Sequence, residues 1–179
     1  MMQAMHRLAV AALSLLAVAG CGGRVQPTAV DELRGTYRGV GVGDTTAEVE
    51  RVFGHEPLSG QREPIAPRKE DFVDIGGPTV IAGGCGTNLR YDHVTFFVCD
   101  GRVDGFIVAQ SGAHTTRGIA IGDDAKKARA LYPKLTCGES PFEGGSYPYC
   151  DGRIAAHRWL WFGRDPIRSI TVATVPLRT

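Results

Sequence analysis

The chain has 179 residues, of which 43% are hydrophobic and 22% charged, and its formal net charge at pH 7 is +1. A nucleic-acid-binding surface needs clustered Lys and Arg, so this balance gives no indication of a nucleic-acid partner. Removal of the first 20 residues, which we expect for the reasons below, leaves 159 residues with a side-chain charge of 0. That length is enough for one sizeable domain or two small ones.

The first 20 residues are typical of a secretory signal peptide. Arg7 supplies a positive charge, and residues 8–19 form an apolar run that only Ser14 interrupts. A run of 12 residues is too short to cross a hydrocarbon core of about 30 Å as a helix. A basic start, a short apolar segment and small residues at its end therefore predict a cleaved export signal over residues 1–20.

The signal ends in Val18-Ala19-Gly20-Cys21. This segment resembles the lipobox of bacterial lipoproteins, in which an aliphatic residue and two small residues precede a cysteine. The resemblance implies cleavage before Cys21, a diacylglycerol on its sulfur and often a further acyl chain, such as palmitate, on the new amine. Two or more chains hold a protein stably at a membrane. We therefore expect a lipid anchor at the outer side of the cell membrane and a polar tether over residues 21–37; the alternative is a chance cysteine behind an ordinary signal.

Besides Cys21, the exported part of the sequence contains four cysteines. Export places them in an oxidising compartment, where an even number is typical of disulfide bonds. Of the three possible connectivities we favour Cys85–Cys99 and Cys137–Cys150, because each closes a short loop of roughly 15 residues, worth about 3 kcal/mol in chain entropy. The sequence has no Cys-x-x-Cys motif and no His cluster with ligand spacing, so we expect no metal site.

An internal repeat organises the exported part. The segment Arg38–Asp44 recurs as Arg117–Asp123, 79 residues later. In both copies, apolar residues then recur at the spacing of one helix face, and Gly54 or Pro133 follows as a stop signal, which predicts two short helices.

Strand patterns follow each predicted helix. Residues 93–98 match residues 157–162 at an offset of 64, and both runs are aromatic and β-branched, which predicts strands. Asp100-Gly101 directly after the first run predicts a tight hairpin, and Asp151-Gly152 suggests another hairpin in the second copy.

These patterns predict an α+β fold built from two tandem modules, residues 38–112 and residues 113–179. Each module is expected to be a short helix plus an antiparallel β-meander. One such unit is barely able to bury its own core, so the two could share one continuous, concave sheet with helices on one face.

Residues 118–128 read Gly-x-x-Ile-Gly-Asp-x-x-x-x-Ala. This motif resembles the module of BamE (SmpA/OmlA) assembly lipoproteins and each half of the β-lactamase inhibitory protein (BLIP). The second resemblance is closer, because that family also has two tandem copies, a disulfide placed like Cys137–Cys150 and a strand similar to Ala156-His157-Arg158-Trp159. The resemblance implies a concave sheet that binds proteins and needs no cofactor. The first copy departs from the pattern, since it has no cysteine directly after its helix and has Cys99 at a strand end.

Strand alternation divides the aromatic residues between two faces of the sheet. The more uniformly apolar set is the better candidate for the core: Phe96, Val98, Leu160 and Phe162. The open face would then carry the residues that we expect to bind a protein: Phe97, Tyr147, Tyr149, His157, Trp159 and Trp161. Two alternatives stay open at this point: the rings cover the sheet against the long loop that precedes its first strand, or the two faces are reversed.

Aromatic residues on an open face favour partner binding, since Trp and Tyr dominate interface energetics. We therefore expect a non-enzymatic lipoprotein that binds an envelope or extracellular protein. A structural accessory of envelope assembly is the competing function, and an enzyme such as a hydrolase is a third. Against the enzyme, residues 39–43 fit no phosphate-binding loop, and His114 near Ser111 has no evident third partner.

Overall fold

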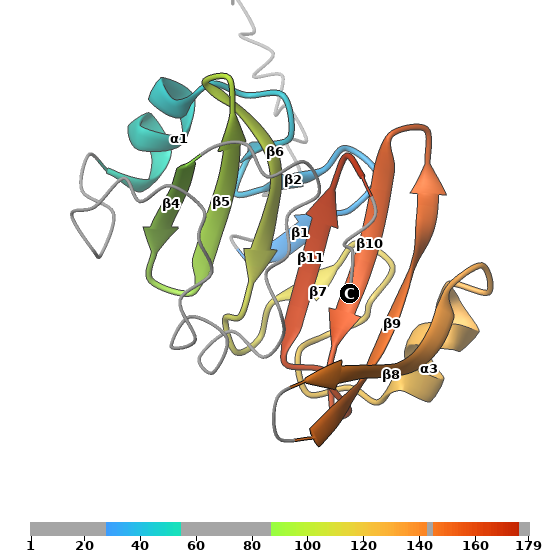
Figure 1. Cartoon of the computed structure of the whole chain (residues 1–179). Coiled ribbons are helices and arrows are strands. Elements are labelled where there is room, and N and C mark those ends of the chain that lie inside the picture. Colours follow the sequence, from blue (N-terminus) through green and yellow to red (C-terminus); the bar gives the residue numbers. More distant parts are fainter. Residues whose placement is uncertain (1–27, 55–86, 143–144, 176–179) are drawn as a thin grey trace, which may run out of the picture.

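The computed structural model describes residues 28–54, 87–142 and 145–175 (Figure 1). The predicted signal peptide, Cys21 and Cys85 lie outside the described residues. No helix in the described ranges is long and apolar enough to cross a membrane.

The predicted α+β class is wrong, because the protein is mostly β. Strands make up 49% of the described part and helices 14%, with two sheets and two helices. Helix α1 spans Thr46–Phe53 and helix α3 spans Ala125–Leu131. The repeat did predict helices at these two places, but both are too short to balance the sheets.

The larger sheet has seven strands in the order β4-β5-β6-β11-β10-β9-β8. All its neighbouring pairs are antiparallel. Its strands are β4 (Thr87–Tyr91), β5 (Val94–Cys99), β6 (Arg102–Val108), β8 (Thr136–Phe142), β9 (Gly145–Ala155), β10 (Arg158–Gly163) and β11 (Ser169–Ala173). The contact between β6 and β11 joins the strands of the first repeat copy to those of the second.

The smaller sheet has the order β3-β2-β1-β7 and lies behind the larger one in Figure 1. Its strands are β1 (Ala29–Asp31), β2 (Thr36–Tyr37), β3 (Val40–Gly41) and β7 (His114–Thr115). Strand β1 is parallel to β7, which belongs to the second copy. The polar tether predicted over residues 21–37 is therefore too long, because the chain is already part of a sheet from Ala29 onward.

The repeat is visible in the hydrogen bonds of the turn before each helix. The Gly41 amide donates to the Asp44 carboxylate at 2.8 Å, and the Ala120 amide donates to the Asp123 carboxylate at 2.7 Å. One residue before each aspartate, a glycine amide donates at 2.8 Å, to the carbonyl of Val103 in β6 in one copy and to that of Ile167, just before β11, in the other. The turn before each helix is thus bound to the last large-sheet strand of its own copy, at Val103 in β6, or just before that strand, at Ile167 ahead of β11.

The main core lies on one face of the larger sheet, as the alternation predicts. Phe96, Leu160 and Phe162 are fully buried there, together with Val98. The helices lie at opposite ends of this sheet, with α1 beside β4 and α3 beside β8 and β9 (Figure 1). A single core therefore runs across both copies of the repeat.

Candidate functional site

Two rows of side chains cross the second face of the larger sheet, which we call the aromatic face. One row runs through Trp161, Thr171, Ile107 and Thr95. The neighbouring row runs through Trp159, Ala173, Gly105 and Phe97. None of these residues belongs to the main core, so sequence alternation assigned both tryptophans and Phe97 to the correct face.

The centre of the aromatic face is nevertheless closed to solvent. Phe97, Trp161 and Tyr147 have exposed fractions of only 1%, 3% and 8%. The expectation that these three rings are open to a partner is therefore wrong in this conformation. Alternation tells which face of a sheet a side chain occupies, but it does not tell whether that face is in contact with solvent.

The remaining three candidates lie toward the β9 side of the aromatic face. Trp159 and Tyr149 are half-buried, and His157 is exposed in the turn between β9 and β10, where its φ is 51°. The Tyr149 ring lies 6.3 Å from the Trp161 ring, between centroids. The aromatic face therefore changes from closed to accessible along β10, between Trp161 and Trp159.

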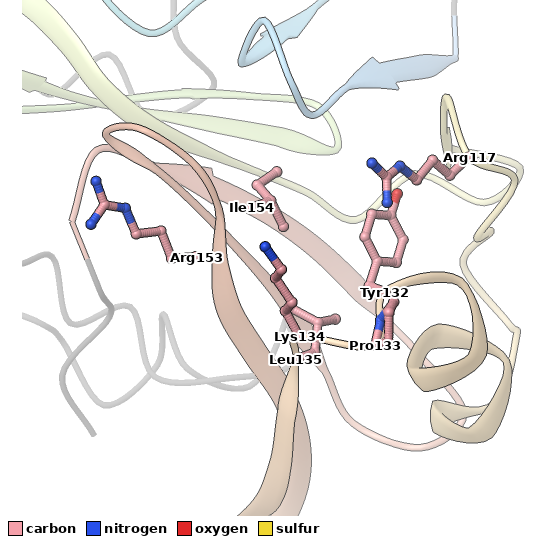
Figure 2. A pocket seen from close by; sticks show the side chains of 7 residues that line it. All are labelled: Arg117, Tyr132, Pro133, Lys134, Leu135, Arg153 and Ile154. Carbon is pink, nitrogen blue, oxygen red and sulfur yellow. The ribbon is translucent and has the colours of Figure 1, made fainter.

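A pocket of about 150 Å³ lies next to this accessible end. Strand β8 begins at Thr136, opposite Asp151, so β9 continues beyond it to Ala155 and leaves a recess. The recess is lined by the turn after β7, the segment after α3 and the free end of β9, through Arg117, Tyr132, Pro133, Lys134, Leu135, Arg153 and Ile154. In Figure 2, Lys134 extends toward Ile154, with Arg153 and Arg117 on opposite sides.

All three charged side chains that line the pocket are cationic. The Arg117 guanidinium lies 5.0 Å from the centre of the Tyr132 ring. The Arg153 Nε donates to its own strand, at the carbonyl of Ala155, at 3.2 Å. Within the described ranges Lys134 has no hydrogen bond or ion pair. The pocket therefore concentrates positive charge beside an apolar wall.

Tyr132 separates this pocket from a buried carboxylate. Its phenol donates to Glu32 at 2.7 Å, and Glu32 is fully buried. Burial is the main cause that raises the pKa of Tyr132 far above its usual range, so the phenol stays protonated and can donate. The Glu32 side chain thus accepts a hydrogen bond on the inner side of the ring.

Sequence reasoning missed the pocket, although one signal was available. Arg38 and Phe53 are the repeat counterparts of Arg117 and Tyr132, and the Arg38 guanidinium lies 5.8 Å from the centre of the Phe53 ring. The same pairing of an arginine with an aromatic ring therefore occurs in both copies. Lys134 and Arg153 carry no comparable signal, because they come from separate segments with no motif.

The cysteine predictions have separate outcomes. Cys137 and Cys150 form a disulfide between neighbouring strands β8 and β9, which confirms that pair. Cys99 is also disulfide-bonded, but Cys85 lies outside the described residues, so the Cys85–Cys99 pairing stays a prediction. Within the ranges that the structure covers, there is no group of three or more His, Cys, Asp or Glu side chains suited to a metal ion.

No protein-family model and no curated protein matches this chain. The crystal structure of an extracellular protein containing a SCP domain, from Bacillus anthracis strain Ames, is distantly similar, with 14% identity and a TM-score of 0.48. The match covers 74% of this chain and 43% of the other, so the chain spans less than half the length of that protein. At this level the similarity supports no inference about function.

Proposed function

We propose that the chain is a lipid-anchored, extracytoplasmic and non-enzymatic protein that binds another protein. The lipobox-like segment that ends at Cys21 supports the anchor, and the Cys137–Cys150 disulfide supports an oxidising compartment. The resemblance of the repeat to β-lactamase inhibitory protein and BamE modules supports protein binding in the cell envelope.

The observation that carries the binding proposal is the neighbourhood of Trp159 and Arg153. These residues are directly paired across β10 and β9, and neither is buried. Trp and Arg are enriched among the residues that contribute most to protein interfaces. We therefore place the binding surface at the β9–β10 end of the aromatic face, with Trp159, Arg153 and His157 as its residues, rather than at the buried centre.

A site-specific crosslinking experiment tests this surface. A photoreactive amino acid replaces Trp159 in one variant and exposed Val52 on α1 in the control, and both variants are expressed in the native bacterium. We expect the probe at position 159 to capture a discrete envelope protein that the probe at position 52 does not. Equal capture at both positions, or none at position 159, would overturn the proposal.

The competing function, a structural accessory of envelope assembly, predicts a different dependence on the anchor. For an accessory, membrane location is the contribution, so Cys21→Ala should remove the protein from its complex. For a binder, the soluble Cys21→Ala protein should still crosslink from position 159 when its partner is added in solution.

A further inference from the structure

The pocket beside β9 has the wrong size for a cofactor. Sites for small molecules of cofactor or drug size enclose about 300–1,000 Å³, whereas this pocket encloses about 150 Å³. The space suits one side chain or one small ion.

The charges around the pocket select for an anion. Arg117, Lys134 and Arg153 line it, and no acidic residue of the described ranges does. Glu32, which lies behind the Tyr132 ring, already accepts hydrogen bonds from Thr116 and Tyr132. Among the residues that the structure describes, no acidic side chain in the pocket neutralises the three cations.

The rest of the lining narrows the anion to a carboxylate on a short apolar stem. Pro133, Leu135 and Ile154 add apolar surface to the lining of the pocket. Inorganic phosphate is polar on every side and leaves this apolar surface without a matching one, whereas the methylene groups of a glutamate side chain cover it. Arg and Lys then bind the carboxylate through charge-assisted hydrogen bonds.

We propose that this pocket receives a carboxylate side chain from an acidic segment of the partner protein. The inference rests on the proposed function, and it adds the chemistry that the partner must present. Trp159 and the pocket are linked through Arg153, which pairs with Trp159 and lines the pocket. A partner segment that contacts Trp159 can thus place its carboxylate in the pocket.

Titration of the full chain in a non-ionic detergent tests the pocket directly. The probes are glutarate, the neutral glutaramide and inorganic phosphate, followed by ¹H–¹⁵N spectra. We expect glutarate to shift the amide signals of Lys134 and Ile154, and glutaramide and phosphate to bind at least about tenfold more weakly. Equal shifts with glutaramide or phosphate would overturn the assignment to a carboxylate.

A matched pair of lysine variants completes the test. Lys134→Gln removes the charge from the pocket, and Lys126→Gln removes one from the exposed side of α3. We expect glutarate affinity to fall about fivefold to tenfold in the first variant and to stay unchanged in the second. Equal affinity in both variants would refute the pocket.

Crosslinking from position 159 in the Lys134→Gln background separates the two proposals. Capture that weakens with Lys134→Gln supports both the surface and the pocket. Capture that is unaffected leaves the binding surface intact and refutes the role of the pocket. Absence of capture at position 159 in the chain that keeps Lys134, with glutarate binding intact, refutes the binding surface alone.

Discussion

The phenol of Tyr132 donates a 2.7 Å hydrogen bond to the buried carboxylate of Glu32, 100 positions earlier in the chain. The backbone amide and hydroxyl of Thr116 donate to the same carboxylate at 2.9 and 2.8 Å. Glu32 directly follows β1, whereas Thr116 and Tyr132 belong to the second copy of the repeat. One buried side chain thus connects the start of the described chain to its second half through hydrogen bonds.

Removing this carboxylate should be strongly destabilising. Glu32→Ala leaves three buried or partly buried donors without an acceptor, and we expect it to lower the free energy of unfolding by about 3 kcal/mol or more. Tyr132→Phe removes one hydrogen bond to a charged group and should cost about 1.5–3 kcal/mol. Urea denaturation measures both, with Tyr149→Phe as a control that should change little. A double variant whose loss equals the sum of the single losses would argue against a shared network.

Gly41 should be intolerant of a side chain, in contrast to its repeat counterpart. A Cβ at Gly41 would lie 1.9 Å from the Gly35 carbonyl oxygen, which is backbone and cannot move aside. We expect Gly41→Ala to cost about 3 kcal/mol through overpacking. The second copy has Ala120 at this place, and Ala120→Gly should cost only about 0.5–1 kcal/mol. Thermal unfolding followed by circular dichroism compares the two, and equal losses would contradict this account.

The Cys137–Cys150 disulfide closes a loop with a sequence separation of 13. Because it limits the entropy of the unfolded chain, the Cys137→Ala/Cys150→Ala protein should lose about 3 kcal/mol of unfolding free energy. Guanidinium unfolding without reductant measures this difference. An unchanged midpoint would show that the pairing of β8 with β9 needs no covalent support.

Asp151 should make stability depend on pH. Burial raises the pKa of its carboxyl above the ordinary value of 3.8, so the folded protein binds the proton more tightly than the unfolded chain. The free energy of unfolding therefore falls as pH rises from 3.8 through the folded-state pKa. Asp151→Asn should raise Tm at pH 7, at roughly 2–4 °C for each kcal/mol, and leave it unchanged at pH 3.

Thermal unfolding at the two pH values checks this prediction. Asp100→Asn, in the exposed turn between β5 and β6, is the control and should give no gain at pH 7. A gain for Asp151→Asn that persists at pH 3 would point to packing instead of charge.

Local sequence signals predicted those parts of the fold in which one short segment decides the structure. Asp100-Gly101 connects β5 and β6, and both residues have positive φ, 50° and 74°, as a tight hairpin turn requires. Asp151-Gly152 has the same sequence signature, but it lies inside β9 and the turn occurs at His157 instead. Gly152 is needed there because a Cβ would meet Leu135 and the Lys134 carbonyl at 3.0 Å.

The fold class and the pocket depended on contacts that no local signal records. The helices after Asp44 and Asp123 were predicted, but strand β8 was not, and with β9 it shifts the balance to a mostly β protein. The pocket brings together Arg117, Lys134 and Arg153 from three segments. The burial of Trp161 could not be predicted from the sequence either. Strand alternation indicates which face of the sheet a side chain occupies, but not whether other residues cover that face.

If lipid holds Cys21, the position of β1 limits how far the domain can move from the bilayer. Ala29 lies in the smaller sheet, in β1 between β2 and β7, and it is only eight positions after Cys21. At about 3.3–3.6 Å per residue, a fully extended chain from Cys21 to Ala29 would span no more than roughly 29 Å. An anchored domain would therefore stay near the bilayer, and a binding partner would have to come equally close to the membrane surface.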